Sequence, residues 1–131
     1  MNNTQDNHSK TALVFVYGSL KRGHNLHSEI ADQQFIGPAL SSAEYQLFDC
    51  GSYPAMVKVT ANGYSIRGEL YRVDDSCLSR LDVVEGVNEG LYVREPVNLQ
   101  EPEACGTTNP VWAWFYLRDI SGLKECGCEW P

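Results

Sequence analysis

The sequence predicts a single α+β domain built on a curled, barrel-like sheet, and three observations support this. The chain has 131 residues, of which 43% are hydrophobic and 11% aromatic, a size and composition at which one buried core forms. About six segments carry the apolar, β-branched and aromatic residues typical of strands. Two further segments show apolar residues at helical spacing. An α+β domain accommodates this mixture best.

The first predicted element is a strand over residues 12–17. Its continuous apolar run suits a central strand that is buried on both faces, and it stops at Gly18. The polar segment 21–23 that follows has the character of a turn. A short helix is predicted to begin near Asn25, which can serve as its N-cap.

Five more strand segments follow along the chain. Those over residues 43–48, 55–59 and 66–73 are separated by strong turn signals, and we expect them to form an antiparallel meander. The last two strands, over residues 92–99 and 111–117, flank a loop that is long enough to have a functional role.

A second helix is predicted between the third and fourth of these strands. Asp75 or Ser76 can cap its N-terminus, and Gly86 can end it in the left-handed conformation. Its apolar stripe consists of Leu78, Leu81 and Val84. This assignment places Glu85 at the C-terminal end of the helix, while Asp82 lies within it.

The two ends of the chain lack periodicity. We therefore expect a flexible arm over residues 1–10, one domain over residues 11–118 and a C-terminal tail over residues 119–131. Neither an apolar segment long enough to span a bilayer nor the apolar part of a secretory signal is present in this sequence. A cytoplasmic protein without a membrane partner is expected.

Charge and cysteine content argue against two classes of function. The net charge of −7 disfavours binding to nucleic acid, because phosphate backbones are usually bound by a dense Lys/Arg surface. His24 and His27 lie near each other in the sequence, as do Cys126 and Cys128, but no paired spacing typical of zinc ligands occurs. We expect solvated histidines, mostly reduced thiols and no bound metal.

Two short motifs contain the candidate functional groups. At the end of the first strand, the turn formed by Tyr17, Gly18, Ser19 and Leu20 can point backbone N–H groups at a carboxylate or phosphate, although an ordinary strand-to-loop turn is the alternative. Glu85 is either a solvated acid or, if buried, a general base with a raised pKa. Asp82 is assigned no proton transfer.

The motifs together with their spacing resemble the γ-glutamylcyclotransferase family over about residues 12–117. The resemblance rests on Tyr17-Gly18-Ser19-Leu20-Lys21-Arg22-Gly23, Tyr53-Pro54-Ala55, Gly68-Glu69-Leu70-Tyr71, Leu81-Asp82-Val83-Val84-Glu85-Gly86, Leu91-Tyr92-Val93-Arg94 and Trp112-Ala113-Trp114-Phe115-Tyr116. The first motif is most similar to the γ-glutamylamine cyclotransferase and avirulence-induced-gene-like branch. One departure is that Leu26, and not the asparagine usual in the family, directly precedes His27.

The resemblance implies a small, mixed, mostly antiparallel β-barrel flanked by helices. It also implies a pocket at one end of the barrel, where the turn formed by Tyr17, Gly18, Ser19 and Leu20 meets Glu85. Enzymes of the family release 5-oxoproline from small γ-glutamyl compounds. In that reaction the α-amine of the substrate attacks its own γ-carbonyl, and Glu85 would act as general acid and base without metal or cofactor.

The sequence also predicts further pocket residues and allows alternative functions. Tyr17, Tyr92 and Tyr116 are expected to line the substrate pocket, and Arg94 either pairs with an acid or recognises a carboxylate. A non-catalytic ligand-binding or regulatory module with the same pocket is the main alternative. A hydrolase or acyltransferase that uses water or another amine is the second. The leaving group and the oligomeric state are not determined, with a monomer as the starting expectation.

Overall fold

The computed structural model describes residues 10–102 and 110–130, whose strands form two sheets. The large sheet has the order β6-β8-β1-β5-β2-β7 and the small sheet the order β4-β3-β9. The strands are β1 (Thr11–Val16), β2 (Gln34–Ser41), β3 (Tyr45–Asp49), β4 (Pro54–Lys58), β5 (Arg67–Asp74), β6 (Tyr92–Val97), β7 (Leu99–Glu101), β8 (Val111–Tyr116) and β9 (Lys124–Gly127). One α-helix, α2 (Asp75–Val84), and one 3-10 turn, η1 (His27–Glu29), accompany them in the described residues.

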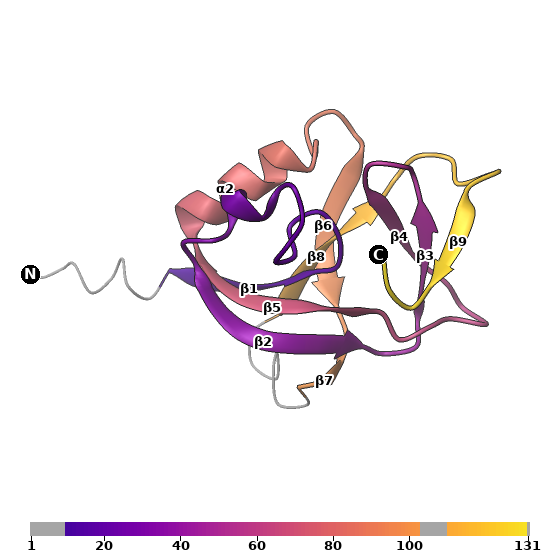
Figure 1. Cartoon of the computed structure of the whole chain (residues 1–131), viewed down its shortest axis with the longest axis horizontal. Helices are drawn as coiled ribbons and strands as arrows, with labels where there is room; N and C mark the ends of the chain where they lie inside the picture. Colours follow the sequence, from indigo (N-terminus) through magenta and orange to yellow (C-terminus); the bar gives the residue numbers. More distant parts are fainter. Residues whose placement is uncertain (1–9, 103–109, 131) are drawn as a thin grey trace, which may run out of the picture.

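The predicted α+β class with a curled, mixed sheet is confirmed. Figure 1 shows α2 and η1 together on one side of the large sheet, with the small sheet beside it. Among the described strands, β1 and β8 pair in parallel, and the other strand pairs are antiparallel. Among the same residues, no helix has both the length and the apolar character that crossing a bilayer requires.

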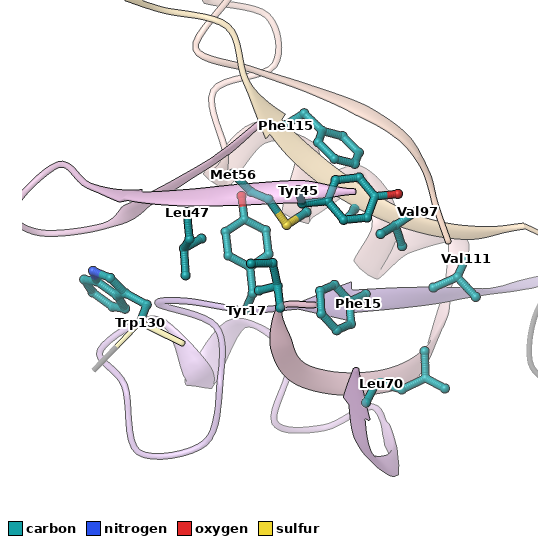
Figure 2. Close-up of a cluster of buried hydrophobic side chains, with 13 residues drawn as sticks. Phe15, Tyr17, Tyr45, Leu47, Met56, Leu70, Val97, Val111, Phe115 and Trp130 are labelled. Carbon is teal, nitrogen blue, oxygen red and sulfur yellow. The ribbon is translucent and has the colours of Figure 1, made fainter. Parts of the chain in front are cut away.

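Strand β1 lies at the centre of the large sheet and is buried on both faces, as its apolar run predicts. Because successive side chains of a strand point to opposite faces, Phe15 contributes to one core cluster while Val14 and Val16 contribute to another. The first cluster lies between the two sheets, and Figure 2 shows Phe15 and Tyr17 in it near Met56 of β4. The second cluster packs the large sheet against α2.

Helix α2 follows β5 without a loop. Its N-cap is Asp74, whose carboxylate accepts a hydrogen bond of 2.7 Å from the Cys77 N–H, so the cap lies one residue before the earlier of the two predicted positions. Leu81 is buried in the second core cluster. Gly86 has a φ of +69°, which confirms the predicted left-handed stop, and Glu85 is the C-cap.

The predicted antiparallel meander is wrong. Strands β3 and β4 pair with each other, but β5 belongs to the large sheet, where it pairs with β1 and β2. Strand β2 was not predicted because Gly37 and Pro38 interrupt its pattern; in the structure a register shift at Gly37 accommodates them. The helix expected near Asn25 is only the single 3-10 turn η1.

The C-terminal segment also differs from the expected tail. Strand β9 pairs with β3, and Trp130, which is 9% exposed, belongs to the first core cluster. The buried Lys21 Nζ donates to the Trp130 carbonyl at 3.1 Å. Residues 119–130 are therefore part of the domain. The predicted arm over residues 1–10 lies outside the described residues except for Lys10, and so does most of the loop that follows β7.

Candidate active site

A cavity of about 190 Å³ opens beside the C-terminal end of β1. Its lining includes the backbone turn Tyr17, Gly18, Ser19 and Leu20, together with Glu85 from the end of α2 and Tyr92 from β6. The remaining lining residues are Phe15, Val16, Leu26, Tyr53, Pro54, Val84, Leu91 and Trp114. The structure thus brings all but one of the predicted site residues to one cavity, which has the size for a small molecule.

The turn after β1 is held by hydrogen bonds to its carbonyl groups. The Gly18 carbonyl accepts from the Lys21 N–H at 3.0 Å, and the Ser19 carbonyl accepts from the Leu26 N–H at 2.9 Å. The Leu20 carbonyl lies 3.0 Å from His27 Nδ1, which donates to it in the corresponding tautomer. Within residues 10–102 and 110–130, no protein group accepts a hydrogen bond from the N–H of Gly18, Ser19 or Leu20. These three donors are available to an anionic ligand.

Gly18 is required by packing against Pro54. A Cβ at position 18 would lie 2.4 Å from Pro54 Cγ and 2.6 Å from Pro54 Cδ, far inside contact distance. Pro54 also lines the cavity, and its carbonyl accepts a hydrogen bond of 2.5 Å from the Tyr92 hydroxyl. The close approach of the turn to Pro54 therefore shapes two walls of the cavity at once.

The carboxylate of Glu85 is placed where its charged form is disfavoured. Burial raises the pKa of Glu85 to about 7, and the negative charge of Asp82, one helical turn earlier, adds a smaller contribution in the same direction. Glu85 is also the C-cap of α2, where the helix dipole disfavours a negative charge. The residue can therefore both take and return a proton near neutral pH.

Two tyrosines from the cavity wall donate their hydroxyl protons to backbone carbonyls. The Tyr17 hydroxyl donates to the Trp114 carbonyl at 2.5 Å, and the Tyr92 hydroxyl donates to the Pro54 carbonyl. Desolvation raises the pKa of both phenols well above the ordinary value, so both stay protonated. A phenol has one proton, and its oxygen can then only accept. The Met56 backbone N–H already approaches the Tyr17 oxygen, which leaves Tyr92 as the freer acceptor.

Three sequence-based expectations about side chains have different outcomes. Tyr116 does not line the cavity; its ring packs edge-on against Tyr92 with centroids 5.5 Å apart, and its hydroxyl faces the Cys50 thiol. Arg94 pairs with an acid, Asp82, at 2.9 Å. The two histidines have separate surroundings, since the His24 ring packs at a tilt against Trp130 and His27 contacts the Leu20 carbonyl.

Several lining residues are not among the site residues that the sequence predicts. Tyr53, Pro54 and Trp114 lie in motifs that carry the family resemblance, but the sequence assigns them to a turn and a strand and gives none of them a role in the site. Trp114 reaches the cavity because β8 pairs in parallel with β1, a pairing between segments about a hundred residues apart. The Tyr53-Pro54 pair was a usable signal, because proline in a sheet is confined to positions such as the first residue of a strand, and Pro54 is the first residue of β4.

The cavity thus combines two complementary features. Free N–H donors on the turn suit a carboxylate, while the Glu85 carboxylate and the Tyr92 oxygen suit an ammonium group or an amine. A ligand that carries both groups on one carbon, such as an α-amino acid, matches this arrangement.

The raised pKa of Glu85 predicts that the variant Glu85→Gln is more stable than the parent at alkaline pH. In the parent, the unfolded chain releases this proton near pH 4.5 and the folded protein near pH 7, so folded-state stability falls as pH rises through that window. One pKa unit corresponds to about 1.4 kcal/mol. Above pH 7 the parent has therefore lost about 3 kcal/mol of its free energy of unfolding through this group. Thermal unfolding at pH 5 and pH 8 measures it: the Tm gain of the variant should be several degrees larger at pH 8.

Glu89→Gln is the matched control for this measurement. Glu89 is exposed and lies four residues further along the chain, and the same chemical change there should give no pH-dependent gain in Tm. An equal Tm difference between parent and Glu85→Gln at both pH values would contradict the raised pKa.

The known proteins that this chain resembles share one family description. The family model described as gamma-glutamyl cyclotransferase, AIG2-like, matches residues 14–130. The gamma-glutamylcyclotransferase family protein YtfP of Escherichia coli K12 is 33% identical over 111 residues, covering 85% of this chain and 88% of the relative. A protein of Arabidopsis thaliana, named as a candidate gamma-glutamylcyclotransferase, is 41% identical over 100 residues.

The extent of these matches differs. The alignment covers 71% of this chain but only 54% of the Arabidopsis relative, so the chain spans about half of that protein. Among solved structures, an AIG2-like protein of Mus musculus superimposes with a TM-score of 0.66 and 27% identity, covering 83% of this chain and 78% of the mouse chain.

Proposed function

The chain belongs to the AIG2-like γ-glutamyl cyclotransferase family, and we propose that it is an enzyme that releases 5-oxoproline from a small γ-glutamyl amine or γ-glutamyl amino acid. The observation that carries this proposal is the position of Glu85. Its carboxylate, with a pKa of about 7, shares one small cavity with three backbone N–H donors for which the described residues provide no acceptor.

The substrate is positioned by its α-amino acid end. Its α-carboxylate binds the N–H groups of Gly18, Ser19 and Leu20, and its α-ammonium faces Glu85 and the Tyr92 oxygen. Because the carboxylate and the ammonium group on the α-carbon are both held in place, the γ-carbonyl stays within reach of the α-amine. Ring closure is an intramolecular reaction, for which correct positioning alone can supply a large part of the rate.

Glu85 then moves one proton. Its ionised form takes a proton from the α-ammonium, and the free amine attacks the γ-carbonyl. The protonated Glu85 returns that proton to the departing amine as the C–N bond to the leaving group breaks. The attacking nitrogen loses a second proton as it becomes the lactam N–H, and this proton passes to the released amine. The products are 5-oxoproline and the amine in its ammonium form, and Glu85 ends in its starting ionised form. A pKa near 7 suits both half-reactions, since about half of the carboxyl groups are ionised at neutral pH.

Incubation with a panel of γ-glutamyl amines and γ-glutamyl amino acids tests the proposal. We expect stoichiometric 5-oxoproline and free amine from at least one of these compounds, measured by mass spectrometry, without added metal. Release of glutamate would instead indicate a hydrolase, and transfer of the γ-glutamyl group to an added amine would indicate an acyltransferase. Binding of 5-oxoproline without turnover of any compound would favour a non-catalytic module.

A further inference from the structure

A partly buried polar cluster of Asp82, Arg94 and Trp114 lies behind Glu85, and of its three members only Trp114 lines the cavity. Asp82, on the last turns of α2, accepts hydrogen bonds from Arg94 Nε on β6 and from Trp114 Nε1 on β8, both at 2.9 Å to the same oxygen. The second Asp82 oxygen lies 3.2 Å from Arg94 Nε. Asp82 and Arg94 are each only 26% exposed. The guanidinium of Arg94 is 4.8 Å from the ring centroid of Trp112.

The cluster joins three elements at the end of the helix that carries Glu85. Helix α2 packs mainly against β5, β1 and η1, whereas Asp82 connects it to β6 and β8. Arg94 and Trp114 are themselves direct partners in the β6–β8 ladder. Trp114 also lines the cavity, and its carbonyl accepts from the Tyr17 hydroxyl. A single carboxylate thus connects the last turns of α2 to the two strands that supply Tyr92 and Trp114 to the cavity wall.

We propose that Asp82, held by Arg94 and Trp114, is the positioning residue for Glu85, so that both the placement and the protonation of Glu85 depend on the Asp82–Arg94 ion pair. The inference rests on the proposed role of Glu85 in proton transfer. Asp82 lies three residues before Glu85, which puts both side chains on the same side of the helix. It does not touch the substrate and acts through its neighbours.

Several ionisable groups surround Glu85 besides Asp82. Tyr17, directly after β1, and Tyr92 of β6 stay protonated, and Cys50, whose pKa burial raises, lies near both. Glu89 is exposed in the loop beyond Gly86. The charged group that acts on Glu85 is Asp82, whose negative charge favours the protonated form of Glu85. Arg94, the ion-pair partner of Asp82, carries the opposite charge and offsets it.

The two members of the pair provide a test that separates positioning from simple structural support. In Asp82→Asn, the negative charge is lost and the Arg94 cation stays, so Glu85 should ionise at lower pH than in the parent. In Arg94→Gln, Asp82 loses its counter-charge and Glu85 should ionise at higher pH. The double variant removes both charges and should return close to the parent.

The measurement is the titration of the Glu85 carboxyl by ¹³C chemical shift in the full chain, with Glu85→Gln used to assign the signal. We expect opposite shifts in the two single variants and a fall in kcat of about tenfold or more in both, because small displacements of a reacting group are costly. Arg80→Gln is the matched control. Arg80 lies on the same helix but pairs with Glu29, 3.5 Å away, and its loss should leave the titration unchanged.

The titration needs no turnover, so it distinguishes failure of this inference from failure of the proposed reaction. Shifts in the same direction, or none, in the two single variants would overturn the positioning role even in an active enzyme. If Asp82→Asn does not fold, the direction of the shift in Arg94→Gln decides. If the Glu85 titration shifted in opposite directions in the two single variants but the protein turned over no γ-glutamyl compound, the positioning role of Asp82 would be supported and the proposed reaction rejected.

Discussion

Turnover of a γ-glutamyl substrate should fall by about a hundredfold or more in Glu85→Gln, the usual contribution of a positioned acid–base group. The amide keeps the shape of the side chain but can neither take the proton of the α-ammonium nor return it to the leaving amine. Ligand binding should largely survive, because in the proposed binding mode the α-carboxylate is held by the backbone of the Gly18 turn. Steady-state release of 5-oxoproline should thus show a loss in kcat with a smaller change in KM.

The contacts of the neighbouring acids decide which of them can serve as a control. Asp82 is another acid of the same motif, but its contacts with Arg94 and Trp114 make it unsuitable, since its replacement would disturb Glu85. Glu89→Gln is a better control, because Glu89 is exposed and does not line the cavity. If Glu85→Gln kept near-normal release on a substrate that the parent clearly uses, the proposed proton transfer would be rejected.

Replacement of Gly18 should have the second large effect. In Gly18→Ala the new methyl group would overlap Pro54 Cγ and Cδ, at 2.4 and 2.6 Å, and the turn and Pro54 would have to move apart. Overpacking of this kind costs about 1–3 kcal/mol of folding stability. The displaced N–H donors and the displaced Tyr92 contact should lower kcat/KM by about a hundredfold, since positioning is what the turn contributes.

A second substitution checks that the clash is the cause. Pro54→Ala removes the two ring atoms that the new methyl group would meet, so Gly18→Ala combined with Pro54→Ala should recover part of the lost kcat/KM and of the lost affinity for 5-oxoproline. Calorimetric titration with 5-oxoproline and steady-state kinetics measure the two quantities. A double variant as impaired as the sum of the single variants would show that Pro54 is not responsible.

Much of the local structure follows from the sequence. The apolar run of β1 predicts its burial on both faces, and the stripe of α2 followed by Gly86 predicts the helix end that carries Glu85. Both patterns work because side-chain burial follows the repeat of a strand or a helix. The two motifs that supply Gly18 and Glu85 are each contiguous in the chain, so their residues could be named before their contacts were known.

Only the tertiary structure decides which distant segments meet. The parallel pairing of β1 with β8 brings Trp114 to the cavity, and β5 joins the large sheet and not the meander expected from its neighbours. Strand pairing is set by packing over the whole chain and not by the local pattern. The same is true of polar contacts: the carboxylate of Asp82 finds Arg94 and Trp114 only after α2, β6 and β8 have packed, and the raised pKa of Glu85 arises from the burial that this packing produces.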